Sequence, residues 1–358
     1  MTKAVSFGII GSGWRAGFYL RAAQALPQRF AACGLVSRSP EKRAAVTREW
    51  GVPCFADMDD LLAHGAPDFL VISVNRQAAP AVIARAVSRG LPVLTETPPA
   101  GDMEGLLALH RLAKAGAIIH VAEQYPQQPM HAARLAVARS GALGTIEEAQ
   151  VSFSHGYHGV GMIRALLGVN FENARIRAFR YPTRFVAGPG RDGLPAAEQM
   201  KEANHDIALF DFGGKLGVYD FAADQHRSYA RSPRILVRGD RGEINGHAVH
   251  RVENFRLPLC AELTLRQTGL EGNLEGFFIR GVTLGEKWVY RNPFAPARLT
   301  EEEIAVAACL QGVADTLAGQ KGGYPLAQGL QDRYLDQMME DAIRSGGEVV
   351  TATQPWAE

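Results

Sequence analysis

The chain has 358 residues, of which 47% are hydrophobic and 21% are charged, and its formal net charge is +1. This length and composition predict a soluble globular protein of two domains. The balanced charge argues against a nucleic acid or an anionic membrane as partner, and no apolar run has the length of a transmembrane helix. Because the chain enters a strand directly and its four cysteines are dispersed, we expect a cytoplasmic protein without a signal peptide.

The first motif is a glycine turn between a strand and a helix. Val5–Ile10 is an apolar run typical of a buried parallel strand, and Trp14–Leu26 places apolar residues at helical spacing. Between them, Gly11 allows a tight turn and Gly13 lets the backbone approach a pyrophosphate, while Ala16 lets the helix pack close to the strand. The motif therefore predicts a dinucleotide site, with a merely tight turn as the alternative.

Strands and helices then alternate through the first third of the chain. Strands are predicted at Phe30–Ser37, Cys54–Phe55, Phe69–Val74, Leu91–Glu96 and Ile118–Ala122, and helices at Pro40–Trp50, Asp59–His64, Ala78–Arg89 and Asp102–Ala115. This alternation is typical of a doubly wound parallel sheet that binds its ligand at the carboxyl ends of the strands. We predict a dinucleotide-binding domain over residues 1–122.

The end of the second strand indicates which dinucleotide binds. A carboxylate there would hold the adenosine ribose 2′-hydroxyl, but the chain has Ser37-Arg38-Ser39. An arginine can grip a 2′-phosphate through two hydrogen bonds. The sequence therefore predicts NADP in preference to NAD, unless Arg38 is simply a solvated loop residue.

The rest of the chain has strands in series with few helices. Strands are predicted at Thr145–Ser154, Ile176–Arg180, Ala208–Phe212, Gly217–Ala222, Ile235–Arg238, Phe255–Pro258, Leu263–Gln267 and Trp288–Arg291, and helices at Pro129–Arg139, Thr300–Leu317 and Pro325–Ser345. This order predicts an α+β domain with a large, mostly antiparallel sheet over residues 123–358. Phe185–Asn204, rich in glycine, proline and charge, is expected to be a long loop that lines or covers a site.

Several segments in order resemble the Gfo/Idh/MocA family, the relatives of glucose-fructose oxidoreductase and inositol dehydrogenase. They are the glycine turn, Val93–Pro98, the His158…Arg164…Gly168 segment, Gly239–Ile244 and Tyr324–Asp332. The resemblance implies an N-terminal Rossmann domain and a C-terminal α+β domain. It also implies an NAD(P)-dependent oxidoreductase acting on a sugar, cyclitol or related polyol, and a homo-oligomer, dimer or tetramer, formed through the C-terminal sheet.

Two catalytic positions of the family differ in this chain. In its E-K-P motif, Glu96 and Pro98 match but Thr97 stands at the lysine position; in its H-x-x-D pair, His158 matches but Gly161 stands at the aspartate position. A threonine hydroxyl cannot titrate near neutral pH, whereas a histidine can. His158 is therefore the candidate acid/base and Thr97 the candidate for positioning the reacting oxygen. The alternative is that His158 caps or packs a helix start.

The remaining candidates follow from the strand ends and from the resemblance. The predicted cofactor-binding residues are Gly11, Ser12, Gly13, Trp14, Arg15, Ala16, Ser37, Arg38, Val74, Glu96 and Thr97, and the predicted substrate-binding residues are Glu123, Tyr125, Tyr157, His158 and Arg164. Glu123 could instead be a solvated hinge carboxylate, and Arg164 could pair along its helix surface. His155 and His158 have no further ligand at zinc spacing, so no metal is expected.

Two other functions stay open. The chain could be a redox-neutral lyase or hydrolase that retains its nicotinamide and oxidises its substrate only transiently. It could also be a non-catalytic dinucleotide-binding sensor or partner subunit, which the missing lysine and aspartate would favour. The sequence leaves the substrate and the direction of reaction open.

Overall fold

A computed structural model describes residues 4–191 and 193–357. Backbone contacts divide the chain into two units, and in both of them chain segments return from far along the sequence. The first unit comprises Met1–Pro129, Gln267–Arg280 and Asn292–Leu330, and the second Met130–Arg266, Gly281–Arg291 and Gln331–Glu358. None of the helices in the described ranges combines the length and apolarity needed to cross a membrane.

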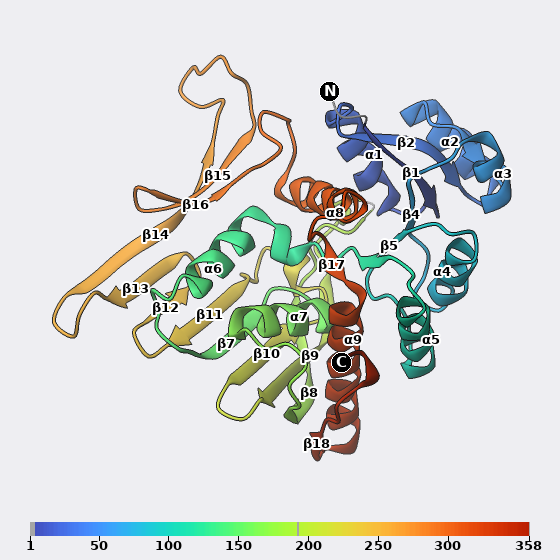
Figure 1. Ribbon diagram of the computed structural model, residues 1–358. Coiled ribbons are helices and arrows are strands. Elements are labelled where there is room, and N and C mark those ends of the chain that lie inside the picture. Colours follow the sequence, from blue (N-terminus) through green and yellow to red (C-terminus); the bar gives the residue numbers. More distant parts are fainter. Residues whose placement is uncertain (1–3, 192, 358) are drawn as a thin grey trace. The chain divides into compact units, whose positions relative to one another are not determined.

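The first unit is built on a seven-stranded sheet with the order β17-β6-β5-β4-β1-β2-β3 (Figure 1). Its strands are β1 (Val5–Ile10), β2 (Phe30–Val36), β3 (Cys54–Phe55), β4 (Phe69–Ile72), β5 (Val93–Thr95), β6 (Ile119–Val121) and β17 (Tyr324–Pro325). The first six pair in parallel, and β17 adds antiparallel to β6. The doubly wound parallel sheet is thus confirmed, with its strand order changing direction between β1 and β4.

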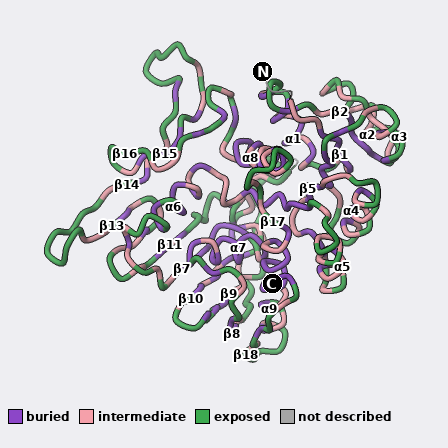
Figure 2. Tube along the Cα trace, viewed as in Figure 1, coloured by how far each residue is buried: buried purple, intermediate pink, exposed green. Residues whose placement is uncertain are grey.

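The helices of the first unit are α1 (Ala16–Ala25), α2 (Pro40–Trp50), α3 (Met58–His64), α4 (Ala79–Val87), α5 (Met103–Lys114) and α8 (Glu301–Leu317), with a short η1 (Tyr125–Gln127). Buried residues follow the strands of the sheet (Figure 2). Phe7, Ile9 and all four residues of β4 are fully buried. In contrast, α2 is exposed or half-buried throughout. The sheet therefore holds the core of the unit, while α2 remains close to solvent.

Helix α8 packs against α1 although nearly 300 residues separate them in the chain. It begins with a capping box in which Thr300 accepts from the Glu303 N–H and the Glu303 carboxylate accepts from the Thr300 N–H. Glu303 also pairs with Arg21 of α1, with a nitrogen–oxygen distance of 2.5 Å. The sequence placed everything after residue 122 in the second domain, whereas the structure returns α8 and β17 to the first unit.

The second unit contains most of an eleven-stranded sheet with the order β16-β15-β14-β13-β12-β11-β7-β10-β9-β8-β18. The strands are β7 (Ile146–Ser152), β8 (Arg175–Val186), β9 (Met200–Asp211), β10 (Leu216–Ala222), β11 (Arg234–Gly239), β12 (Gly242–Asn245), β13 (Ala248–Val252), β14 (Pro258–Gln267), β15 (Ile279–Leu284), β16 (Lys287–Arg291) and β18 (Glu348–Val350). Among the strand pairs whose register the structure describes, β7 and β10 pair in parallel and the others pair antiparallel. The predicted large, mostly antiparallel sheet is confirmed.

The remaining helices are α6 (Pro129–Arg139), which precedes β7 in the chain, α7 (Gly156–Leu167), which follows β7, and α9 (Leu326–Ser345), which precedes β18. Helix α7 packs on β7 and β10. A Cβ on Gly159 would lie 2.5 Å from a ring carbon of Tyr219, and one on Gly217 would lie 2.5 Å from a methyl of Ile163. Glycines on both elements therefore set how closely α7 approaches the sheet.

Some predicted boundaries were wrong. Strand β9 begins at Met200 rather than Ala208, so the long loop between β8 and β9 is shorter than predicted. Residues 253–257 form a turn, and β14 begins only at Pro258. The first half of β9 reads M-K-E-A-N-H and lacks the apolar alternation that marks a half-buried strand.

Candidate functional site

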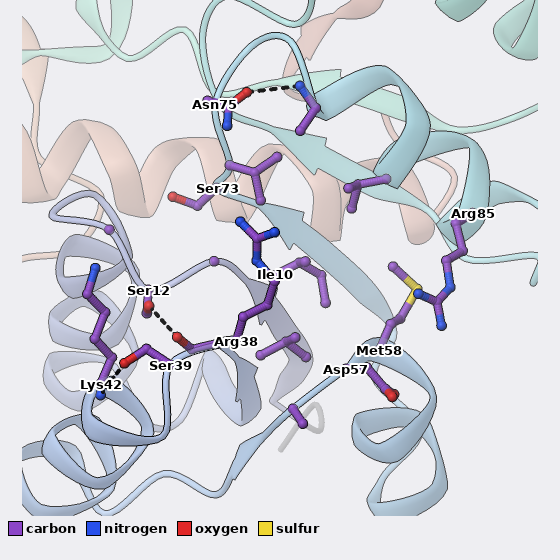
Figure 3. Close-up of a pocket in the computed structure, with 18 residues that line it drawn as sticks. Ile10, Ser12, Arg38, Ser39, Lys42, Asp57, Met58, Ser73, Asn75 and Arg85 are labelled. Carbon is purple, nitrogen blue, oxygen red and sulfur yellow. Dashed lines mark hydrogen bonds between the residues drawn. The ribbon is translucent and has the colours of Figure 1, made fainter.

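A cavity of about 650 Å³ opens at the carboxyl ends of β1, β2 and β4 (Figure 3). It is lined by Ile10, Gly11, Ser12, Gly13, Val36, Ser37, Arg38, Ser39, Lys42, Ala56, Asp57, Met58, Ser73, Val74, Asn75, Ala78, Val82 and Arg85. The cavity therefore lies where the strand order changes direction, the place at which open α/β sheets bind ligands. Six of the predicted cofactor-binding residues, from Gly11 to Val74, meet here.

The glycine turn forms one wall of the cavity. Gly11 has φ +117°, and a Cβ on it would lie 2.1 Å from the Ser73 carbonyl oxygen, so only glycine fits. A Cβ on Gly13 would have nothing within 4 Å. The Ser12 and Ser37 hydroxyls lie 2.7 Å apart and join the turn to the end of β2. Backbone beside open space at the start of α1 is a suitable cradle for a phosphate.

The segment after β2 supplies polar and cationic groups to the same cavity. Ser39 caps α2 by accepting from the Lys42 N–H, and Arg43 donates to the Ser37 carbonyl oxygen at 2.7 Å. Arg38 and Lys42 both line the cavity (Figure 3). Lys42 was not among the residues predicted from the sequence. The signal was available, because Ser39-Pro40 marks a helix start and places residue 42 in its first turn.

Asp57 is the carboxylate in the cavity wall, and its side chain hydrogen-bonds to the backbone at the start of α3. Its side chain caps α3 and accepts from the Asp59 and Asp60 N–H groups at 2.8 and 3.0 Å. Arg85, on the same wall, donates to Asp59 at 2.5 Å. These contacts bind α3 and α4 together beside the cavity.

A half-buried polar cluster lies beyond the end of β5, where Glu96 binds Arg15. The Glu96 carboxylate accepts from Arg15 Nε at 3.1 Å and from the Tyr19 hydroxyl at 2.5 Å. Its other oxygen accepts from the Thr97 N–H at 3.3 Å. Arg15 also donates to Glu302 of α8 at 2.5 Å. Arg15 and Glu96, both predicted to bind cofactor, therefore also bind each other. Glu302 was not among the predicted site residues.

Glu123 lies two residues after the end of β6 and is only 1% exposed. It is thus buried rather than solvated. One of its oxygens accepts from the Tyr125 N–H at 3.4 Å. Burial raises the pKa of Glu123 to about 8, helped by the negative charges of Glu302 and Glu96 and opposed by the Tyr125 N–H and by Arg15. The carboxyl group is accordingly neutral in most molecules at pH 7.

In the second unit, α7 carries the predicted residues Tyr157, His158 and Arg164. His155 caps this helix, and its carbonyl oxygen accepts from the His158 N–H at 3.1 Å. The His158 side chain is buried, with its ring centroid 4.9 Å from that of His155 and 5.2 Å from that of Tyr157. Arg164 is 2% exposed and forms a buried ion pair with Asp332 of α9. The partner of Arg164 is therefore on another helix.

Asp332 also fills the space beside Gly161. A Cβ on Gly161 would lie 3.1 Å from the carboxyl carbon of Asp332. Residues three apart on a helix are neighbours on one face, so this carboxylate lies about one helical turn from His158. Sequence reasoning missed it because Asp332 is 168 residues away from its partner Arg164. In the described ranges, the structure has no group of three or more His, Cys, Asp or Glu side chains placed to hold a metal.

Comparison with known proteins gives a family match for the first third of the chain and a fold for nearly all of it. Residues 5–123 match the Gfo/Idh/MocA oxidoreductase family, NAD-binding Rossmann fold. No curated protein matches the chain. Among solved structures, levoglucosan dehydrogenase with NADH and L-sorbose is 15% identical, with a TM-score of 0.72 over 99% of this chain and 100% of that one.

Two further solved structures are similar over nearly their whole length. An oxidoreductase from Agrobacterium radiobacter, in complex with NAD+, L-tartaric acid and magnesium, is 18% identical with a TM-score of 0.70, over 97% of this chain and 98% of that one. The WlbA dehydrogenase from Bordetella pertussis, with NADH and UDP-GlcNAcA, is 16% identical with a TM-score of 0.66, over 98% and 100%. At these identities the likeness establishes the fold.

Proposed function

We propose that this chain, which over residues 5–123 belongs to the Gfo/Idh/MocA family of oxidoreductases, is an NADP-dependent oxidoreductase. Its substrate is a sugar, cyclitol or related polyol, and hydride is transferred at a secondary alcohol carbon. The observation that carries the proposal is the cavity at the carboxyl ends of β1, β2 and β4, with the glycine turn in its wall. Similar folds crystallised with NAD+ or NADH support it.

The residues of the cavity fit a dinucleotide. The open space beside Gly13 receives the pyrophosphate, and the N–H groups at the start of α1 donate to it. The ring of the bound cofactor supplies the hydride acceptor or donor. The protein binds and orients the cofactor.

NADP is proposed over NAD because Arg38, Ser39 and Lys42 lie in one wall of the cavity. Two cations and the N-terminus of α2 favour a 2′-phosphate, whereas a ribose hydroxyl calls for a carboxylate. The carboxylate in this wall, Asp57, already caps α3. NAD is the alternative cofactor.

We propose that His158 is the acid/base that exchanges the proton of the substrate hydroxyl, and that Thr97 hydrogen-bonds the reacting oxygen. Tyr125, Tyr157 and Arg164 remain proposed substrate contacts. The support for His158 is that an imidazole is the side chain best suited to proton exchange near neutral pH, and that the carboxylate of Asp332 lies against the same face of α7, beside Gly161. The proposed protein is a cytoplasmic homo-oligomer that assembles through the open face of the second-unit sheet, where Phe179 and Leu209 are exposed.

The test is turnover of the wild-type protein and of His158→Ala, screened with NADP+ against a panel of polyols and sugars. We expect wild-type activity on a member of the panel and a loss of about 100- to 10,000-fold in the variant, with cofactor affinity unchanged. Equal turnover by the variant would remove His158 from the mechanism. Cofactor that stays bound and is never exchanged would favour the redox-neutral lyase or hydrolase instead.

A further inference from the structure

Helix α2 begins beside the cavity, but packing does not fix it there. None of its residues is fully buried, and the two cations that line the cavity near its start, Arg38 and Lys42, are both exposed. Helices in proteins are normally held by an apolar face buried against the core. The backbone at the start of α2 must therefore be positioned by hydrogen bonds.

Arg43 supplies two of these hydrogen bonds. From the first turn of α2, its Nη1 donates to the carbonyl oxygen of Ser37 at 2.7 Å and to that of Arg38 at 3.2 Å. These two carbonyl groups stand immediately before and after the Arg38 Cα atom. Arg43 is half-buried and does not line the described cavity. Its guanidinium group therefore holds the backbone of Arg38 from outside the site.

Ser37, which precedes Arg38, is anchored independently of Arg43. Its N–H donates to the Phe55 carbonyl oxygen at 3.0 Å, and its hydroxyl lies 2.7 Å from that of Ser12 in the glycine turn. Loss of the Arg43 hydrogen bonds would therefore leave Ser37 and the glycine turn in place. The backbone that it would free is that of Arg38, whose side chain extends into the cavity (Figure 3).

The cations in the first turn of α2 do not serve the helix. A helix N-terminus carries a partial positive charge, so carboxylates such as Glu41 are favourable there and cations are unfavourable. Lys42 and Arg43 nevertheless follow Glu41, whereas Arg48 has the favourable position in the last turn. Lys42 lines the cavity, and Arg43 binds carbonyl groups of the segment that enters the helix. This placement favours an anion in the cavity over a role in the stability of α2.

We propose that Arg43 is a positioning residue for the 2′-phosphate of NADP, which fixes the Arg38 backbone so that the Arg38 guanidinium group is held ready for the phosphate. This inference rests on the proposed NADP cofactor. Without Arg43, binding of the phosphate would have to order the Arg38 backbone, and the lost conformational entropy would weaken the affinity. Arg43 acts through Arg38 and makes no contact of its own with the cofactor.

Arg43 should affect selectivity between the two cofactors rather than affinity in general. NADH carries a hydroxyl group where NADPH carries the 2′-phosphate, so an ordered Arg38 matters to NADPH alone. The glycine turn, which both cofactors need, keeps its hydrogen bond to Ser37 whether or not Arg43 is present. Arg43 therefore raises the affinity for NADPH and leaves the affinity for NADH unchanged.

The experiment is a double-mutant cycle on the full chain, with the Kd values for NADPH and NADH measured by nicotinamide fluorescence. Arg43→Ala should weaken NADPH binding by about tenfold, the cost of ordering the backbone of one residue, and leave NADH binding unchanged. In the Arg38→Ala background, the further change Arg43→Ala should have little effect on NADPH binding, because the side chain that Arg43 positions is already gone. The matched control is Arg48→Ala, which removes a cation from the other end of α2 and should leave both affinities unchanged.

The cycle separates positioning from the other roles of a cation. Equal weakening of NADPH and NADH binding by Arg43→Ala, additive effects of Arg38→Ala and Arg43→Ala, or an equal effect of Arg48→Ala would each overturn the role of Arg43. If the wild type does not prefer NADPH, the proposed cofactor is wrong. If it does and Arg43→Ala keeps the full preference, only the role of Arg43 is wrong.

A further measurement needs no variant. NMR relaxation of the cofactor-free wild type should give the Arg38 backbone N–H an order parameter of about 0.85, the value of rigid backbone, and NADPH should change it little. An order parameter below about 0.6 that rises only when NADPH binds would overturn the inference, because Arg38 would then be ordered by the cofactor and not by Arg43.

Discussion

Arg38 and Lys42 are the residues on which the choice between NADP and NAD depends. Replacing both with Ala should weaken NADPH binding by about 100- to 10,000-fold, because each charge-assisted hydrogen bond contributes about 1.5–3 kcal/mol and two are removed. NADH binding should change little. Nicotinamide fluorescence titrations of the double variant and of the wild type with NADPH and NADH measure these affinities.

The matched control for that double variant is Arg89→Ala, which removes a cation that pairs with Asp59 and is not part of the cavity wall. It should leave both affinities unchanged. If NADH binding is weakened as much as NADPH binding in the double variant, the two cations bind the pyrophosphate or stabilise the fold rather than bind a 2′-phosphate.

Helices α7 and α9 meet through a glycine and a carboxylate. Gly161→Asp should destabilise the protein by several kcal/mol, because the new carboxylate would stand against Asp332, itself 0% exposed. Gly161→Ala, which adds only a Cβ with its nearest neighbours 3.1 Å away, should cost about 1–3 kcal/mol. The free energies of unfolding of the two variants, measured in urea, separate the effect of the added charge from the effect of the added volume.

The same pair tests whether Asp332 takes the place of a carboxylate on α7. In a Gly161→Asp, Asp332→Asn double variant, the two charges no longer oppose each other, and most of the stability lost in Gly161→Asp should return. Equal stability of the single and double variants would contradict the electrostatic explanation.

The elements show what a sequence can predict and what it cannot. The parallel strands were predictable because each is a short apolar run bounded by turn residues, as in Phe69–Ile72. The hairpin of β12 and β13 was missed because its strands are only four and five residues long. Its two-residue turn begins with Gly246, at φ +63°, and this glycine was the available signal.

The parts of the candidate site that come from short, continuous stretches of sequence were predictable. The glycine turn and Ser37-Arg38 lie together because a strand end and the following helix start are fixed by local sequence. The partners Glu302 and Asp332 come from helices far along the chain. Their pairing is decided by tertiary packing, which no local spacing in the sequence encodes.

At the scale of the whole molecule, the first unit depends on the last third of the chain. Helix α8 covers α1, whose Tyr19 and Leu20 are buried, and β17 completes the sheet beside β6. A fragment of residues 1–122 should therefore lack a cooperative thermal transition and expose apolar surface. Calorimetry and binding of a hydrophobic dye measure this, with the full chain as reference. Cooperative unfolding of the fragment would show that the segment folds alone.

The most direct test of the central claim is cofactor binding at the glycine turn, measured by nicotinamide fluorescence for the wild-type chain and for Gly13→Val. The wild type should bind NADPH more tightly than NADH. In Gly13→Val, a side chain enters open space, so binding should be lost while the thermal unfolding temperature stays the same. Binding of neither cofactor by the wild type, or unchanged binding by Gly13→Val, would contradict the account.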